Sequence, residues 1–431
     1  MAKHVRIGLL GCGTVGVAFA ELLVERSSSV EDIADVKLDL VRIAVRDPDK
    51  PRSPALDRTL FTADADEVVR ADDVDVVVEL IGGTAAAGEL VRTALESGKP
   101  VVTANKELIA AQGPELFALA EKAGADLFFE AAAVAAVPIL RPIRESLLAE
   151  EVHSVVGIIN GTTNFMLTRM MSEGLSFDQA LARARELGYA EPDASADIEG
   201  GDAAAKIAII ASLAFNQAVP ADEVGREGIV GLDREDIETA EQFGYVIKLL
   251  AVAERFPDDG AGRGPVSAQV FPALVDSSHP LANVHDSFNA VFITTAAAGE
   301  LMFYGHGAGP RPTASAILGD AVAAADHSLR GTHRRVPVGP PAELRPSREL
   351  VHPYYVRVDI AEAPGVLSEV TGVFGRHGVS IQKVDQRSEG PQARVVFITF
   401  PAPEHALAGA LSELAEHDQV RAVRRVLRIC S

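Results

Sequence analysis

Cysteine, long apolar runs and positive charge are all scarce in this chain of 431 residues. Its two cysteines, Cys12 and Cys430, are too few for a disulfide framework, and neither has the spacing of a zinc site. No apolar run approaches the roughly 20 residues of a membrane span. The first residues also lack the apolar region and small-residue cleavage site of a signal peptide. These absences predict a cytoplasmic protein that does not enter a membrane.

Basic residues are outnumbered by acidic ones, 40 against 61, which gives a formal net charge of −21. We therefore expect no nucleic acid and no anionic membrane as partner. The hydrophobic share of 48% and the charged share of 23% are ordinary for a globular protein. At roughly 100–200 residues per domain, the length predicts two to four domains.

Short apolar runs alternate with helical patterns in the first third of the chain. Strands are predicted over residues 5–10, 38–45, 74–82 and 100–103, and helices over 14–26 and 90–98. This alternation is typical of a parallel sheet with helices on both faces, so the predicted fold class is α/β.

A glycine-rich segment, GLLGCGTVG, joins the first predicted strand to the first predicted helix. Gly11 would permit a tight turn, Gly13 would let a pyrophosphate approach the backbone, and Gly16 would let helix and strand pack closely. Thr14 and Val15 open the helix, whose free amides would meet the phosphates. A purely structural turn is the alternative, but this context favours a Rossmann-type dinucleotide-binding domain.

The second predicted strand ends in AVRD, which leaves the nucleotide open. Asp47 would bind the ribose 2′-hydroxyl of NAD, whereas Arg46 would bind the 2′-phosphate of NADP. A solvated charged turn is as good an explanation for either residue. We expect NADP, with NAD as the alternative.

Two other segments of the first half carry polar groups among apolar residues. Thr103 ends a predicted strand and Lys106 follows it, at the edge where open parallel sheets bind ligands. We expect both to contact the cofactor, and Lys106 also the substrate; for Lys106, a surface lysine starting a helix is the alternative. Glu130 lies between Phe129 and an alanine run, and a carboxylate there needs a cation or backbone amides as its partner.

The segment EPDASADIEGGDAAAK concentrates carboxylates ahead of one lysine. Asp202 and Lys206 are four residues apart and share one face of a predicted helix, where a plain ion pair is the alternative to a site. Because the rest of this helix is apolar, we expect Lys206 in a partly enclosed place, where a lysine can give and take a proton. The neighbouring carboxylates would suit the ammonium group of an amino acid.

The remainder of the chain changes character twice. Residues 245–304 read mainly as strands of an open mixed or antiparallel sheet, whose exposed face or edge predicts self-association. Residues 329–352 are rich in Pro, Arg and Gly and read as a linker. Beyond them the order is βαββαβ, which is ferredoxin-like.

Together these segments resemble homoserine dehydrogenase in its three-domain form with a C-terminal ACT domain. The matching segments are GLLGCGTVG, TANK, GIINGTTNFMLTRM, LGYAEPDASADIEGGDAAAK and YGHGAGPRPTASAILGD. The portion from Asp197 to Lys206 is a specific signal, whereas the glycine loop is not.

The resemblance implies a domain plan. Residues 1–135 would form the Rossmann-type domain, completed by about 305–328, and residues 136–304 a central α+β domain with an open sheet for catalysis and dimerisation. Residues 329–352 would be a linker and 353–431 a ferredoxin-like ACT regulatory domain. Deletion of this last domain is expected to leave the catalytic chemistry intact.

The resemblance also implies the reaction, which is reversible NAD(P)H-dependent reduction of L-aspartate 4-semialdehyde to L-homoserine in threonine, methionine and isoleucine biosynthesis. Lys206 matches the proton donor, and Lys106 a lysine at the junction of cofactor and substrate. The matches to substrate-binding and nucleotide-loop residues are Glu191, Asp202 and, more weakly, Asp197, and then Gly307 and Gly309.

A sodium ion, a homodimer or homotetramer, and L-threonine as effector are implied as well. The sodium ligands would be the side chain of Glu130 and the carbonyls of Ala133, Ala135 and Val137. Threonine would bind near Gly365, where a helix begins; a stabilising domain without a ligand is the alternative.

Two departures from the family pattern stand out. Ala135 and Ala136 replace glycines, and EPDA replaces EADP in the acidic segment. The competing hypotheses are another Rossmann oxidoreductase with an ACT tail, acting on a hydroxy acid, and a non-enzymatic sensor of nucleotides and amino acids. The sensor leaves Lys106, Lys206 and the carboxylates unexplained.

Overall fold

The computed structural model describes residues 3–257, 263–389 and 392–430. The chain forms two compact units, the first from residues 1–161, 202–224 and 287–342, and the second from 162–201, 225–286 and 343–431. Neither unit is one continuous stretch, because the chain passes between them several times. Among the helices of the described residues, none is long and apolar enough to span a membrane.

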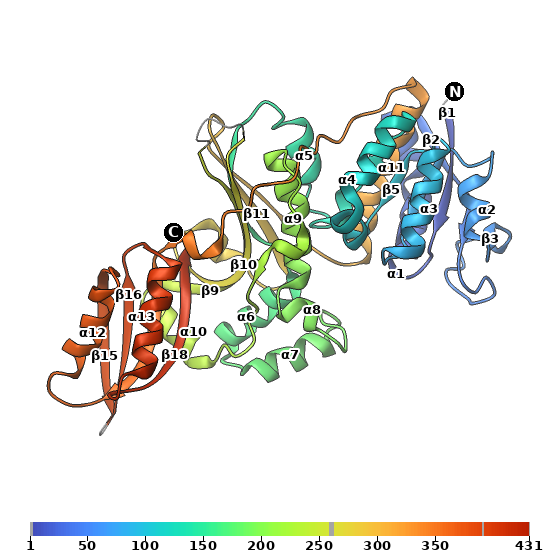
Figure 1. Ribbon diagram of the computed structural model, residues 1–431. Coiled ribbons are helices and arrows are strands. Elements are labelled where there is room, and N and C mark those ends of the chain that lie inside the picture. The colour runs from blue at the N-terminus through green and yellow to red at the C-terminus, as the bar shows by residue number, and fades with distance from the viewer. Residues whose placement is uncertain (1–2, 258–262, 390–391, 431) are drawn as a thin grey trace. The chain divides into compact units, whose positions relative to one another are not determined.

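A parallel sheet in the order β3-β2-β1-β4-β5-β6 forms the start of the first unit (Figure 1). Its strands are β1 (Lys3–Leu10), β2 (Val36–Ala44), β3 (Phe61–Thr62), β4 (Val76–Glu79), β5 (Val101–Thr103) and β6 (Leu127–Phe128). The order reverses between β1 and β4, and ligands of open α/β sheets bind at such a switch point, outside the carboxyl ends of the strands. The predicted α/β fold class is confirmed.

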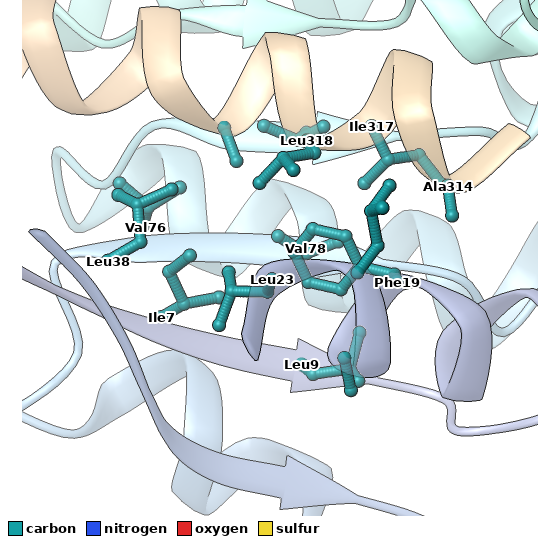
Figure 2. Close-up of a cluster of buried hydrophobic side chains, with 14 of the residues drawn as sticks. Ile7, Leu9, Phe19, Leu23, Leu38, Val76, Val78, Ala314, Ile317 and Leu318 are labelled. Atoms are coloured by element: carbon teal, nitrogen blue, oxygen red, sulfur yellow. The ribbon is translucent and has the colours of Figure 1, made fainter. Parts of the chain in front are cut away.

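Helices cover this sheet. They are α1 (Thr14–Ala34), α2 (Ala65–Arg70), α3 (Ala85–Glu96), α4 (Lys106–Ala123) and α11 (Pro310–Arg330). Phe19 and Leu23 of α1 and Ile317 of α11 pack against strand residues such as Ile7 and Val78 in one core (Figure 2). α11 therefore completes this domain, although it begins 296 residues after the start of α1 (310 − 14). The first helix runs beyond the predicted 14–26, because no glycine or proline interrupts residues 27–34.

The first unit also contains the antiparallel strands β7, β11 and β12 and two further helices. Their bounds are β7 (Val152–Ile158), β11 (Phe288–Thr295), β12 (Glu300–His306), α5 (Leu140–Glu145) and α9 (Gly201–Phe215). α9 is buried along most of its length, as its alanine and isoleucine content predicts.

The second unit contains a sheet in the order β9-β10-β18-β14-β16-β15. The strands of this unit are β8 (Gly225–Arg226), β9 (Tyr245–Arg255), β10 (Val266–Asp276), β13 (Val351–His352), β14 (Tyr354–Ala361), β15 (Ile381–Glu389), β16 (Gln392–Thr399), β17 (Ala402–Pro403) and β18 (Val420–Cys430). Its helices are α6 (Gly161–Glu173), α7 (Phe177–Glu186), α8 (Ser195–Ile198), α10 (Arg234–Gln242), α12 (Val366–Arg376) and α13 (Glu404–Glu416). The predicted ferredoxin-like order is confirmed in β14-α12-β15-β16-α13-β18.

The two faces of β14 meet different partners. Val356 and Val358 point into an apolar core with α12 and α13. Arg357 and Asp359 alternate with them and point to the opposite face. There the Arg357 guanidinium lies 3.1 Å from the carboxylate of Asp236 in α10. The C-terminal domain is therefore joined to α10, and β18 additionally pairs with β10.

Candidate active site

Two lysines meet at one carboxylate in the first unit. Lys206 Nζ lies 2.7 Å from Asp202 Oδ2, and Lys106 Nζ lies 3.3 Å from Asp202 Oδ1. Asn160 donates to Asp202 Oδ2 at 2.9 Å, and Lys206 donates to the carbonyl of Ile159 at 2.9 Å. The expected pair of Asp202 and Lys206 is present, but as part of a larger cluster.

The cluster is enclosed yet reachable. The side chains of Asp202 and Lys206 are 11% and 12% exposed, whereas that of Lys106 is 35% exposed. Burial opposes ionisation of Asp202, but the charges of Lys206 and Lys106 outweigh it and hold the pKa of this carboxyl below its usual value. One carboxylate beside two cations leaves net positive charge, which suits an oxygen that gains negative charge.

Local sequence explains how each group is positioned. Lys106 is the first residue of α4, and the side chain of Asn105 caps that helix by accepting from Leu108 N at 3.1 Å. Asp202 and Lys206 follow one another by one turn of α9. Asn160 lies between the end of β7 at Ile158 and the start of α6 at Gly161, so the NGTTN segment supplies a site residue as well as opening α6.

The three glycines of the first loop have three different environments. Gly11 has φ of +91°, and a Cβ there would lie 2.7 Å from the carbonyl oxygen of Leu80. A Cβ at Gly16 would lie 2.4 Å from the Gly11 carbonyl oxygen, whereas one at Gly13 would meet nothing within 4 Å. The backbone at Gly13 is open to a ligand, and no side chain caps the helix that begins with Thr14 and Val15.

Thr103, expected to bind the cofactor, has its side chain turned into the protein. It is fully buried, donates to the Glu79 carboxylate at 2.6 Å and accepts from Asn105 N at 3.0 Å. Glu79, which ends a run of three valines, was not among the predicted site residues. A carboxylate closing an apolar strand at the ligand-binding edge was the signal available.

Glu130 is satisfied by backbone amides. Its carboxylate accepts from the N–H groups of Ile139, Leu140 and Arg141 at 2.6–2.8 Å and so caps α5. Burial raises the pKa of Glu130 above its ordinary value, against the effect of these amides. Within the described ranges, no group of three or more His, Cys, Asp or Glu side chains could hold a metal ion.

Ala135 has a left-handed backbone, with φ of +44°. Alanine adopts this region at a cost, so the position is one where glycine is favoured. The departure noted from the sequence therefore falls at a conformationally demanding residue.

The remaining nucleotide residues lie in loops. Arg46 is exposed just after β2, and Asp47 Oδ1 accepts from its own turn at Asp49 N and Lys50 N. A Cβ at Gly307 would lie 2.1 Å from Asn289 Cγ, and Gly309 has φ of +119° directly before α11.

Comparison with known proteins decides the family. Models described as "Homoserine dehydrogenase, NAD binding domain", "Homoserine dehydrogenase" and "ACT domain" match residues 11–130, 138–322 and 354–430. The homoserine dehydrogenase of Corynebacterium glutamicum is 43% identical over 99% of this chain and 95% of its own length. The chain belongs to the homoserine dehydrogenase family.

Solved structures agree with this family. A homoserine dehydrogenase from Thiobacillus denitrificans has a TM-score of 0.92 at 36% identity and covers 100% of this chain and 99% of its own. A hyperthermophilic archaeal homoserine dehydrogenase in complex with NADPH has a TM-score of 0.62 at 30% identity, over 75% of this chain and 98% of its own. The chain is thus an NAD(P)-dependent oxidoreductase acting on a CH–OH group, with the activity of a homoserine dehydrogenase.

Two residues that the homoserine dehydrogenase resemblance assigns to substrate binding belong to the second unit. Glu191 is exposed in the segment between α7 and α8, and Asp197 lies within α8. Their part in the site around Lys206 stays a prediction.

Proposed function

We propose that Lys206 is the proton donor in the reduction of L-aspartate 4-semialdehyde to L-homoserine. The convergence of Lys106 and Lys206 on Asp202 carries this proposal. An ammonium held on a carboxylate and a backbone carbonyl keeps its N–H groups oriented, so one of them can point at the aldehyde oxygen.

The chemistry needs one hydride and one proton, and a reduced nicotinamide dinucleotide, when bound, supplies the hydride. Lys206 gives its proton to the carbonyl oxygen, which becomes the hydroxyl, and its amine then regains a proton from solvent. Asp202 holds Lys206 in place during this exchange. In the reverse direction the neutral amine takes the hydroxyl proton.

The substrate's charged groups would bind around the same cluster. Lys106 is the more exposed cation and would attract the α-carboxylate, while Glu191, Asp202 and, more weakly, Asp197 would bind the α-ammonium. This division leaves Lys206 free to act on the aldehyde.

The experiment is Lys206→Ala in the full-length enzyme. We expect kcat to fall by about 10²–10⁴, the usual contribution of a positioned acid–base group. Lys122→Ala, at an exposed lysine of α4, is the matched control and should leave kcat unchanged. Turnover near the wild-type value in Lys206→Ala would refute the assignment.

We propose NADP as the preferred nucleotide, read by Arg46. Support comes from the exposure of Arg46 and from the use of Asp47 Oδ1 within its own turn. A cavity of about 410 Å³ lies next to this turn, and Lys50, Arg52 and Arg58, which are among its lining residues, place further positive charge there. Arg46→Ala should lower the ratio of kcat/KM for NADPH to that for NADH about tenfold, since a guanidinium–phosphate pair is lost. An unchanged ratio would mean that Arg46 does not determine the preference between NADPH and NADH.

A sodium ion at Ala133, Ala135 and Val137 is also proposed. These residues are buried, and none of the backbone hydrogen bonds between described residues outside helices and strands ends on their carbonyl oxygens. Buried carbonyls need a partner, and Glu130 Oε2, which accepts one amide, has acceptor capacity left. Replacing sodium by choline at constant ionic strength should lower the melting temperature. Equal melting curves would count against the ion.

We further propose that L-threonine inhibits through the ACT domain. Gly365 has φ of +91° and precedes α12, whose first amides have no side-chain cap. Ser368→Glu would place a carboxylate on these amides and should weaken inhibition, whereas Ser412→Glu on α13 should not. Equal inhibition of the wild type and both variants would mean that threonine acts at another site.

A homodimer or homotetramer in the cytoplasm, serving threonine, methionine and isoleucine biosynthesis, completes the proposal. β12 pairs only with β11 among the described strands and leaves Met302 and Tyr304 37% and 54% exposed. Such a surface favours association. A monomer in sedimentation at micromolar concentration would contradict it.

A further inference from the structure

Glu79 is a fully buried carboxylate at the carboxyl edge of the parallel sheet. It is the last residue of β4 and lies beside Leu10 of β1 and Thr103 of β5 in the sheet register. Among the described residues, the hydrogen bonds to this carboxylate come from two backbone amides and one hydroxyl, and none of these donors is a cation. A carboxylate is expensive to bury in this way, and its position calls for a role.

One carboxylate oxygen orders the turn that supports the glycine loop. Glu79 Oε1 accepts from Ile81 N at 2.7 Å and from Gly82 N at 3.1 Å. The backbone at Leu80 and Ile81 is also what a Cβ at Gly11 would strike, at 2.7 Å and 3.0 Å. This turn is therefore packed directly against the glycine loop.

The other carboxylate oxygen leads to the catalytic cluster. Glu79 Oε2 accepts from the Thr103 hydroxyl at 2.6 Å, and that hydroxyl accepts from Asn105 N at 3.0 Å. The Asn105 side chain donates to the Gly83 carbonyl at 2.7 Å and caps α4 at Leu108. Lys106 is the next residue after this cap.

We propose that Glu79, through Thr103, is a positioning residue that fixes Lys106 relative to the turn at residues 81–83, which packs against the glycine loop. The inference rests on the proposed function of Lys106. A connected chain of hydrogen bonds, here 2.6–3.1 Å long, has few alternative arrangements, so it holds the start of α4 in one register with the turn at residues 81–83. A shift of about 1 Å at a reacting group can cost about a hundredfold in rate.

Two substitutions break the same hydrogen bond from its two sides. Thr103→Val removes the hydroxyl at nearly constant volume, and Glu79→Gln keeps an oxygen for the two amides but turns a donor toward Thr103. Each should lower kcat/KM for aspartate semialdehyde by about 10–100-fold. The dissociation constant of NADPH, read from its own fluorescence, should change by less than about threefold, because the turn at residues 81–83 keeps its support. Thr103→Ser, which retains the hydroxyl, should recover most of the loss.

A double-mutant cycle separates positioning from mere packing. In a Lys106→Met background, Thr103→Val should cost little more, because the residue through which it acts is already gone. An equal loss in both backgrounds would overturn the inference, as would unchanged kcat/KM in Thr103→Val. If Lys106→Met itself were fully active, the proposed role of Lys106 would fail, and this inference with it. If Thr103→Val kept its kcat/KM while Lys106→Met lost activity, the positioning role of Glu79 and Thr103 would be wrong, but the proposed role of Lys106 would stand.

Discussion

The cluster at Asp202 and the cluster at Arg357 are opposite solutions to burying charge. In the first, one carboxylate serves two lysines, and Lys106 remains 35% exposed. In the second, one guanidinium that is 3% exposed serves three carboxylates at 2.8–3.1 Å, those of Asp233, Glu235 and Asp236.

The difference lies in what each cluster leaves for a ligand. Asp236 is fully buried and also receives Arg425 at 2.9 Å, and burial raises its pKa. The carboxyl of Asp202 instead has a lowered pKa and lies next to a cation that solvent reaches. A closed cluster binds protein segments together, whereas an open one can bind a substrate. We therefore expect the cluster at Asp202 to take part in catalysis and the cluster at Arg357 to stabilise the fold.

The largest effect is expected when the closed cluster is removed. Deleting residues 353–431 would take β18 from β10 and leave Asp236 without Arg357 and Arg425. From these contacts we predict that catalysis does not survive this deletion, whereas the sequence led us to expect that it would. We expect insoluble or unfolded protein, as judged by circular dichroism.

Arg357→Met tests the same point in the full chain. Removing one partner from a buried ion cluster costs about 3–5 kcal/mol of stability, while kcat well below the melting temperature should hardly change. Arg421→Met, at an exposed arginine of β18, is the control. A soluble truncated enzyme with wild-type kcat would show that the C-terminal domain is an independent module.

Asp202→Asn should do the reverse, with a large loss of activity and a smaller loss of stability. The amide keeps the shape and can still accept from Asn160, but it no longer neutralises Lys106 and Lys206. We expect kcat/KM to fall by about 10²–10³, as when a preorganised polar group is lost from a site. A variant as unstable as Arg357→Met with normal turnover would erase the distinction between the clusters.

Patterns local in sequence predicted much of this molecule. The strand–helix alternation, the glycine loop and the register of Asp202 with Lys206 all depend on residues within one or two turns of each other. The meeting of Lys106 with Asp202 could not be predicted from spacing, because it joins segments 96 residues apart (202 − 106) through the fold.

Buried polar residues were the hardest to interpret. Glu79 and Arg357 each lie in an apolar strand, where only the partner across space tells a cluster from a solvated face. Glu130 was expected to need a cation or amides, and its three amides come from nine to eleven residues onward. The sequence indicates that buried Glu130 needs a partner, but it does not indicate whether that partner is a cation or backbone amides.

Acid should affect the second unit through His352. Burial, together with the charge of Arg428, lowers the pKa of His352 to about 4, from an ordinary 6.5. Between these values the unfolded chain binds a proton that the folded chain refuses, so stability present above pH 6.5 is lost as the pH falls toward 4. The shift corresponds to at most about 3 kcal/mol.

His352→Phe isolates this contribution, since the ring lies 5.9 Å from Phe271 and an apolar ring fits there. Urea midpoints at pH 7 and pH 5 should differ less in the variant than in the wild type. Identical differences would mean that His352 does not carry the acid sensitivity.

The smallest effect is expected at Ala135, one of the two alanines that the sequence led us to interpret as departures from the family pattern. With φ of +44°, alanine pays about 1 kcal/mol for a left-handed backbone, and glycine does not. Against this, glycine in place of alanine loses about 0.4–1 kcal/mol through the greater freedom of the unfolded chain. Ala135→Gly should therefore raise stability by at most about 0.5 kcal/mol. Ala136→Gly has no such strain to relieve, because its φ is not positive, and should lower stability by about 0.5–1 kcal/mol. Paired urea titrations measure the difference between the two variants. Equal losses at both positions would mean that the left-handed geometry of Ala135 carries no cost.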